Sequence, residues 1–362
     1  MDFDLTPDQI ALGDTASELL GDLASLRRVR AFTESADQFD SALWAALLDQ
    51  GWLLVDTAES EGGLGLGTVE VAVLLETLGG HVAPVPFLST LLTLHAFKLG
   101  GLTADVEQLL AGDTVGCVAW SKRVDAVTAR KVDGSWLLSG RTDPVAYAPC
   151  ANVAIVFALT DAGTTVFRVD LDALGRPARE SAMDVTRPLG WLRFDDTPAQ
   201  YVGDSVIADV LLDRGTVLVG AEMLGAAQAV LDMSVAYAKD RVQFGKPIGS
   251  FQAVKHRCAD MLVDVEGMRS SLYWAAWAIG AQDADASVAA STSKVWGADA
   301  AKRVMASALQ VHGGIGFTWE HDLHFFMKRS QLDQLTFGDA TFHRIRLAEQ
   351  LRRRVEAGVS VI

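Results

Sequence analysis

The sequence predicts an α+β protein in which helical regions precede and follow a small β domain. Residues 1–112 and 209–362 carry apolar side chains at the three-to-four spacing of amphipathic helices. Residues 113–208 instead consist of short segments rich in Val, Thr, Trp and Phe, separated by Gly, Pro and Asp-Gly. We therefore expect three domains with these boundaries: an N-terminal helical domain, a middle β domain and a C-terminal helical bundle.

Length and composition exclude several classes of function. With 362 residues, half of them hydrophobic, the chain can bury a large core and divide into two or three domains. Its net charge of −15 repels phosphate backbones and anionic lipids, so we expect neither nucleic acid nor membrane as a partner. The three cysteines form no CxxC pair, which is typical of free thiols in a reducing compartment, here the cytoplasm, and of a chain without a zinc site.

The N-terminal region begins like a helix and not like an export signal. Thr6 can cap a helix that runs through Leu20, and the residues before it are acidic. The glycine-rich stretch Glu59–Gly67 lacks the third glycine of a GxGxxG motif, and no acidic residue follows it at about 20 positions. We interpret this stretch as a turn between helices and not as a dinucleotide-binding loop.

The middle region shows a clear hairpin signal. Asp133-Gly134 lies between two segments of strand-like composition, Val124–Val132 and Trp136–Ser139. The Asp-Gly pair suits a two-residue turn whose residues both take positive φ angles. This pattern predicts an antiparallel pair of strands at the start of the β domain.

The C-terminal region predicts long helices over residues 214–240, 250–280 and 286–310. The longest apolar run, Thr216–Leu231, is interrupted by Glu222. We therefore expect a buried helix at this position and not a membrane span.

A tight turn separates the first two of these helices and carries Arg241, Gln243 and Phe244, together with Gly245 and Gly249. A guanidinium can bind phosphate oxygens with two hydrogen bonds, an amide can bind a base or a phosphate, and glycines allow close approach to the backbone. These residue types favour a nucleotide diphosphate as ligand. The alternative is that Arg241 only neutralises a helix C-terminus and Phe244 only packs, and the turn alone leaves both interpretations open.

The domain organisation of the chain and several of its motifs resemble those of the acyl-CoA dehydrogenase family, and the resemblance spans nearly the whole chain. EGGLG at residues 61–65 and ETLG at 76–79 look like the stretch that connects helices in the N-terminal domain of that family. RVQFGKPIGSFQ at 241–252 is similar to its RxQFGxxIxxFQ motif, and QVHGGIG at 310–316 to its QxxGGxG motif. The resemblance implies a β-barrel-like middle domain, a C-terminal four-helix bundle and an FAD-dependent enzyme that desaturates an acyl-CoA thioester between its α and β carbons.

In such enzymes the two motifs hold the ADP half of an FAD that the neighbouring subunit mainly binds. The resemblance implies that Arg241 holds the pyrophosphate and that Gln243 and Phe244 line the adenosine side. It likewise implies that amide and backbone groups cradle the diphosphate. The residues to which the resemblance assigns this role are Gln310, Gly313 and Gly314.

The chemistry needs a carboxylate that removes the α-proton while the β-hydrogen leaves as hydride to the flavin. Most of the family supplies a glutamate 27 residues after the glutamine of QxxGG, and this count from Gln310 leads to Phe337. Other members place it on the long central helix, where the matching residue is Gly215. Both positions therefore lack a base. Asp339 is a possible substitute, although Asp after Gly more often serves a cap or turn.

The β domain also departs from the family pattern. The segments that face the flavin ring in the family, Thr-Glu-Pro and Ile-Thr-Asn, are replaced here by Val118–Lys122 and Thr142–Pro149. We therefore expect no complete cradle for the isoalloxazine ring in this chain, and we name no catalytic residue.

Two other groups of residues permit more than one interpretation. His312, His321 and His324 with two nearby carboxylates do not match the spacing of an HExxH zinc site, so we expect no metal. The arginines between Arg344 and Arg354 complement a helix C-terminus, while contact with CoA phosphates or a partner subunit remains open.

The leading hypothesis is a base-lacking subunit of a heteromeric (α2β2) acyl-CoA dehydrogenase acting on a bulky acyl-CoA such as a steroid side-chain CoA. The FAD would be shared across the subunit interface, a homologous subunit would carry the catalytic glutamate, and an electron-transfer flavoprotein or a similar acceptor would reoxidise the flavin. The first alternative is a self-sufficient homotetrameric acyl-CoA dehydrogenase with Asp339 as base. The second is a flavin-free structural or acyl-CoA-binding homologue.

Overall fold

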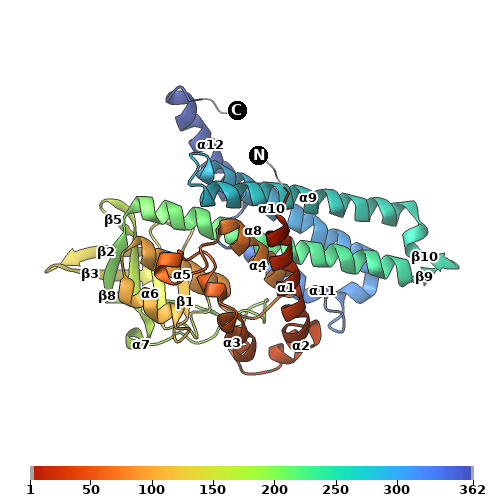
Figure 1. The fold of residues 1–362 in the computed structure, drawn as a ribbon, viewed down its shortest axis with the longest axis horizontal. Coiled ribbons are helices and arrows are strands. Elements are labelled where there is room, and N and C mark those ends of the chain that lie inside the picture. Colours follow the sequence, from red (N-terminus) through yellow and green to blue (C-terminus); the bar gives the residue numbers. More distant parts are fainter. Residues whose placement is uncertain (1–3, 360–362) are drawn as a thin grey trace. The chain divides into compact units, whose positions relative to one another are not determined.

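The computed structural model describes residues 4–359. The contacts within the chain divide it into two units, which we describe separately. The helical unit contains residues up to 29, residues 67–83 and residues from 216 onward, and the mixed unit contains residues 30–66 and 84–215. The element order, helices first, then strands, then helices, is the one predicted (Figure 1). The domain boundaries after residues 112 and 208 remain a prediction.

The mixed unit is built around a β sheet that closes on itself. Its strand order is β1-β5-β2-β3-β8-β6, and an additional β5–β6 pairing completes the ring. The sheet therefore forms the barrel-like middle domain that the family resemblance implies. The strands of this sheet are β1 (Gly116–Ala119), β2 (Val127–Val132), β3 (Ser135–Arg141), β5 (Val153–Thr160), β6 (Gly163–Asp170) and β8 (Arg193–Gly203).

The predicted hairpin is the β2–β3 pair. Val132 pairs with Ser135, and the two residues between them, Asp133 and Gly134, have φ angles of 48° and 88°. The core of the sheet is apolar, with Leu138, Val156 and Phe167 fully buried within it. A separate two-stranded sheet joins β4 (Val145–Ala146) to β7 (Leu189–Gly190).

Helices complete the mixed unit, and helices together with a short β hairpin form the helical unit. Along the chain the first group is α2 (Leu26–Thr33), α3 (Ser41–Asp49), α5 (Phe87–Leu99), α6 (Thr103–Leu110) and α7 (Leu171–Leu174), with 3₁₀ turns at Trp52–Leu54 and Glu59–Glu61. The second group is α1 (Pro7–Leu23), α4 (Thr68–Gly80), α9 (Gln252–Gly280), α10 (Ala286–His312), α11 (Leu323–Leu335) and α12 (Ala340–Glu356). The long helix α8 (Ser205–Asp240) begins in the mixed unit and continues through the helical unit.

Local sequence explains where several of these helices begin. The side chain of Thr6 accepts a hydrogen bond from the Gln9 amide at 3.2 Å, and the Gln9 side chain accepts one from the Thr6 amide at 2.9 Å. This reciprocal pair is a capping box, and it confirms Thr6 as the predicted cap of α1. Asp40 is the N-cap of α3, and its carboxylate accepts a hydrogen bond from the Leu43 amide at 2.9 Å.

The helix α8 is apolar because it is buried. It is the one helix in residues 4–359 that is long and apolar enough to cross a membrane by length and composition, but 78% of its most apolar window is buried inside the protein. A burial of this extent is typical of the core helix of a globular protein. It agrees with the interpretation of Thr216–Leu231 as a buried helix.

Candidate functional site

The turn predicted after the first long helix is a short hairpin at the end of α8 and α9 (Figure 1). β9 (Val242–Gln243) pairs with β10 (Lys246–Pro247), and the two turn residues, Phe244 and Gly245, have φ angles of 54° and 77°. Glycine accepts this backbone conformation freely, whereas a phenylalanine is strained in it. The Phe244 side chain is nevertheless 92% exposed, so its own packing does not explain why it occupies this position.

Backbone hydrogen bonds hold Arg241 in place and leave its side chain available. Its amide donates to the Tyr237 carbonyl at 2.9 Å, and its carbonyl accepts from the Ile248 amide at 2.8 Å. The guanidinium is exposed and forms no ion pair with any residue between 4 and 359. Gln243 is also exposed, and its side-chain amide nitrogen donates to the neighbouring Val242 carbonyl at 2.8 Å.

The second predicted motif forms an open glycine turn. α10 ends at His312, and Gly313 follows with φ 62° and ψ −142° before a 3₁₀ turn over Gly313–Phe317. A Cβ atom added to Gly313 or to Gly314 would meet no atom within 4 Å. Gln310 and Gly314 are exposed. The backbone at this turn is therefore accessible to a ligand, as a diphosphate cradle requires.

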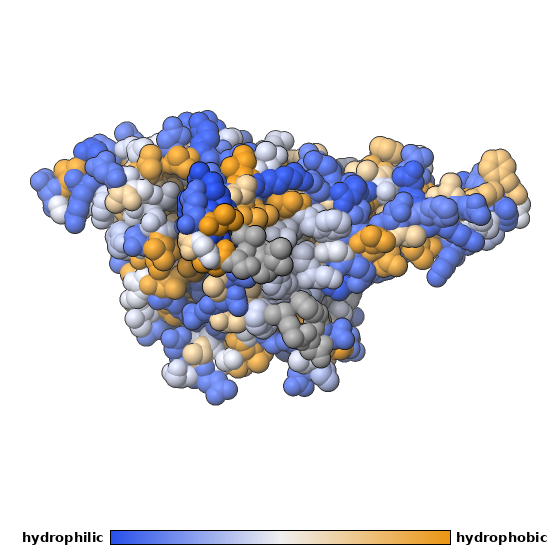
Figure 2. Space-filling model, turned by 90° about the horizontal axis from the view of Figure 1, so that it is seen from above, coloured by the Kyte–Doolittle hydropathy of each residue, from blue (hydrophilic) through white to orange (hydrophobic). Residues whose placement is uncertain are grey.

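One aromatic contact brings the two motifs together. The His312 ring stacks on the Tyr237 ring, with centroids 4.7 Å apart and planes 24° from parallel. Tyr237 also accepts the hydrogen bond from the Arg241 amide, so the hairpin and the glycine turn lie at the same end of the bundle. In the space-filling view this end, at the right, carries hydrophobic and hydrophilic side chains side by side (Figure 2).

His312 contributes to this contact as a neutral ring. Its Nδ1 atom lies 2.8 Å from the Ala308 carbonyl, which can only accept a hydrogen bond, so Nδ1 carries the proton. Burial lowers the pKa of His312 below its ordinary value. The rings of His312 and His321 are 4.6 Å apart, but no group of three potential metal-ligating side chains comes together within the described residues.

The residues at the predicted FAD positions fit one half of that cofactor. An exposed guanidinium, two exposed amide side chains and an open glycine backbone suit a diphosphate with its adenosine. All of these groups are accessible to solvent.

The position expected for the catalytic base holds a buried phenyl ring. Phe337 is 5% exposed and has a φ angle of 57°. His343 Nε2 donates to its carbonyl at 2.8 Å, and Lys294 Nζ donates to the preceding carbonyl, that of Thr336, at 2.8 Å. This segment is thus held firmly in place, but its side chain cannot accept a proton.

The two other candidate base positions also offer little to the reaction. Asp339 is the N-cap of α12, and its carboxylate accepts a hydrogen bond from the Phe342 amide at 2.8 Å. This is the cap role expected for Asp after Gly. Gly215 lies buried within α8 and has no side chain.

The segment that replaces the ring cradle packs into the mixed unit itself. Within Thr142–Pro149, Val145 and Tyr147 are each 3% exposed and Ala148 is fully buried. The Arg187 guanidinium lies 6.0 Å from the centre of the Tyr147 ring. These side chains contribute to the interior of the unit and do not line an open site.

The buried histidine beneath Phe337 predicts a loss of stability in acid. Burial lowers the pKa of His343 from 6.5 to about 3, and the nearby Lys294 and Arg346 charges add to this shift. Between these two pH values the unfolded chain binds a proton that the folded chain does not, so stability falls as pH decreases, by up to about 1.4 kcal/mol per unit. We expect urea unfolding to show this slope between pH 6.5 and 5.

A substitution isolates this contribution from that of other buried histidines. His343→Gln should reduce the dependence of the unfolding free energy on pH, because glutamine does not titrate. His256→Gln, which changes an exposed histidine on α9, is the control and should leave the dependence as in the wild type. An unchanged slope in His343→Gln would show that this histidine is not responsible.

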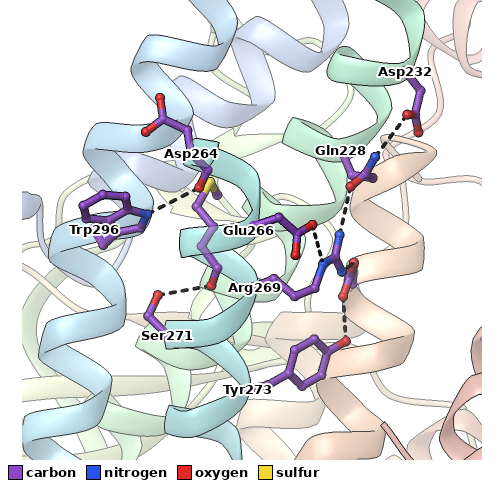
Figure 3. A network of polar contacts seen from close by, with 10 residues as sticks. Gln228, Asp232, Asp264, Glu266, Arg269, Ser271, Tyr273 and Trp296 are labelled. Atoms are coloured by element: carbon purple, nitrogen blue, oxygen red, sulfur yellow. Dashed lines mark hydrogen bonds and ion pairs between the residues drawn. The ribbon is translucent and has the colours of Figure 1, made fainter. Parts of the chain in front are cut away.

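Sequence reasoning missed a polar network between α4, α8 and α9 (Figure 3). The Glu76 carboxylate accepts a hydrogen bond from Tyr273 at 2.6 Å and pairs with Arg269. Arg269 also donates to the Gln228 side chain at 2.9 Å. The network borders a surface cavity of about 370 Å³, and its groups satisfy one another. The one available signal was Glu76, which directly follows the apolar run from Val71 to Leu75 in α4.

Comparison with known proteins agrees with this architecture. Residues 6–101 match the family profile of the acyl-CoA dehydrogenase N-terminal domain, and residues 203–352 match that of the C-terminal domain. Acyl-CoA dehydrogenase IpdE2 of Mycolicibacterium smegmatis is 32% identical over 350 residues, which is 96% of this chain and 98% of that protein. The chain therefore belongs to the acyl-CoA dehydrogenase family.

Two solved structures show the same fold over nearly the full length of this chain. The ChsE4–ChsE5 complex from Mycobacterium tuberculosis matches with a TM-score of 0.90 and 30% identity, covering 97% of this chain and 99% of the matched one. A variant of the Tcur3481–Tcur3483 steroid ACAD also matches with a TM-score of 0.90 and 30% identity, covering 96% and 99%. Each of these two structures is named for two different proteins, ChsE4 with ChsE5 and Tcur3481 with Tcur3483.

Proposed function

We propose that this chain is the base-lacking subunit of a heteromeric, FAD-dependent acyl-CoA dehydrogenase. It supplies the ADP-side contacts to an FAD whose ring is held by a homologous catalytic subunit. One contrast carries the proposal: Arg241, Gln243 and Gln310 are exposed and available, while the base position holds the buried Phe337. A chain with half of a cofactor site and no proton acceptor can serve catalysis only together with another chain.

The chemistry divides between the two subunits accordingly. A bound flavin would supply the hydride acceptor for the β-hydrogen of the acyl-CoA, and a carboxylate would remove the α-proton. This chain provides the guanidinium of Arg241 for the pyrophosphate and the open backbone of Gly313 and Gly314 for its oxygens. Phe337 and Gly215 take no proton, so the partner subunit supplies the carboxylate.

The relatives support a heteromer and suggest a substrate class. The similarity to one chain of the ChsE4–ChsE5 complex favours a pair of unlike subunits. The similarity to the Tcur3481–Tcur3483 steroid ACAD favours a bulky steroid-derived acyl-CoA as substrate. In such a heteromer, one of every two potential active sites would be lost, and this loss would leave room for a bulky acyl group.

Arg241→Ala is the direct test of the shared site. In a complex co-expressed with a homologous subunit that carries the glutamate, we expect this variant to bind FAD at least about tenfold more weakly, because a charge-assisted contact to phosphate is lost. The flavin absorbance per heterodimer measures the effect. Arg257→Ala removes an exposed arginine of α9 outside the motif and should leave the flavin content unchanged.

Two results would contradict the proposal. Stoichiometric FAD and turnover by this chain alone would show that it is self-sufficient. Flavin content unaffected by Arg241→Ala in every complex would favour a flavin-free structural or acyl-CoA-binding role.

A further inference from the structure

Trp319 lies directly beyond the open glycine turn, five residues after Gly314. Its side chain is 55% exposed, although tryptophan usually buries most of its large apolar surface. The ADP-side contacts of the proposed function do not explain this exposure. Its position places an aromatic ring close in sequence to the backbone that is accessible to a diphosphate.

Neighbouring side chains of α11 hold the Trp319 ring in place. The His324 ring stacks on it almost in parallel, at 4.3 Å between centroids and an interplanar angle of 11°. The Lys328 ammonium lies 4.1 Å from the ring centre and 3.5 Å from His324 Nδ1. A hydrogen-bonding contact of 3.3 Å between His324 Nε2 and the Trp319 carbonyl fixes the backbone as well.

This bracing prepares the exposed part of the indole for stacking with a planar ligand. Because the ring is already held in place, the Trp319 side chain would lose little conformational entropy when a planar ligand binds to it. Stacking on an aromatic side chain is a general way to bind a nucleobase, since every base offers a π face. The Lys328 ammonium adds a positive charge beside the ring, which suits the phosphates of a nucleotide.

Other exposed tryptophans of the described chain are placed differently. Trp296 donates its indole N–H to the Asp264 carbonyl at 3.3 Å and packs against Gly267. Trp277, near the C-terminal end of α9, is 40% exposed and has no stacked ring or cation over it. Trp319 therefore combines exposure, bracing and nearness to the glycine turn.

We propose that Trp319 is the stacking platform for the adenine of an adenosine diphosphate group whose phosphates lie at Gly313 and Gly314. This inference rests on the proposed function and extends its ligand contacts by one residue. Two molecules of the reaction carry this group, FAD and the CoA thioester. The experiment is designed to tell them apart.

The test uses the co-expressed complex with Trp319→Ala, Trp319→Phe and the control Trp277→Ala. After the flavin is removed, the dissociation constants of FAD and of FMN, which lacks the adenosine, are measured by flavin fluorescence, and the KM of the acyl-CoA is measured on flavin-saturated complex. We expect Trp319→Ala to weaken FAD binding about tenfold, the size of one lost base stack, and to leave FMN binding unchanged. Trp319→Phe should retain most of the affinity, and Trp277→Ala all of it.

The pattern of results assigns the source of the adenine. A higher dissociation constant for FAD with unchanged KM supports stacking of the FAD adenine. A higher KM with unchanged FAD binding supports stacking of the CoA adenine on the same platform. Size-exclusion chromatography and thermal melting of each variant show whether the complex and the fold are intact.

Other outcomes would contradict the inference that adenine stacks on Trp319. If Trp319→Ala changes neither constant while Arg241→Ala still weakens FAD binding, the inference fails and the proposed function stands. If Trp319→Ala dissociates the subunits without changing either constant, the ring is a protein contact and the inference also fails. If Arg241→Ala has no effect either, the proposed function itself is wrong.

Discussion

Arg329→Met should lower the free energy of unfolding by about 3–5 kcal/mol, because it leaves a buried carboxylate without its counter-ion. Arg329 is fully buried in α11, and its guanidinium lies 2.6 Å from the carboxylate of Glu222, which is 3% exposed in α8. Methionine fills much of the same volume but carries no charge. Urea unfolding of the purified chain measures the difference.

A second variant separates the lost charge pair from the changed packing. In the double variant Glu222→Leu with Arg329→Met, both members of this ion pair are removed, so we expect most of the lost stability to return. A double variant as unstable as the single one would show that shape, and not the unpaired carboxylate, determines the loss. Arg353→Met, at an exposed arginine of α12, should change the stability by less than about 0.5 kcal/mol.

Gly225→Ala should destabilise the protein by at least about 3 kcal/mol or prevent folding, because it forces two helix backbones apart. A Cβ atom at Gly225 of α8 would overlap the Glu76 carbonyl oxygen of α4 and come within 2.8 Å of the Gly80 amide nitrogen. A Cβ atom at Gly79 would likewise overlap the Glu222 carbonyl oxygen. Thermal melting followed by circular dichroism measures the loss.

The same substitution elsewhere in a helix should have the opposite effect. Gly21 lies in α1, and a Cβ atom there would meet nothing within 4 Å. Because alanine favours the helix more than glycine does, Gly21→Ala should stabilise the protein by up to about 1 kcal/mol. Equal effects of the two substitutions would argue against close backbone packing of α4 on α8.

The sequence predicted most elements of the fold because their signals are local. The helix expected over residues 286–310 is α10, Ala286–His312, and the Asp133-Gly134 turn joins β2 to β3 as expected. Helix periodicity and turn chemistry depend on residues only a few positions apart. The β6–β8 pair, which helps to close the sheet, carried no such signal, because it joins segments far apart in the sequence whose register only packing selects.

The candidate site was predictable in its residue types but not in its arrangement. The motifs at Arg241 and Gln310 were readable as sequence, and so was the replacement of the base by Phe337. That Phe337 is buried and that Asp339 caps α12 needed the structure. The contacts of His324 and Lys328 with Trp319 also needed the structure. The sequence shows only that His324 and Lys328 are four residues apart and so lie on the same face of a helix, which by itself indicates no ligand site.

By itself, the sequence determined the kinds of elements, the two nucleotide-type motifs and the lack of a carboxylate at both expected base positions. Only the tertiary structure decided that Tyr237 stacks on His312, which joins the two motifs at one end of the bundle. It alone also decided that Glu222 pairs with Arg329 in the core. The physical reason is distance along the chain: local conformation follows from neighbouring residues, whereas contacts between residues far apart depend on which helices pack together.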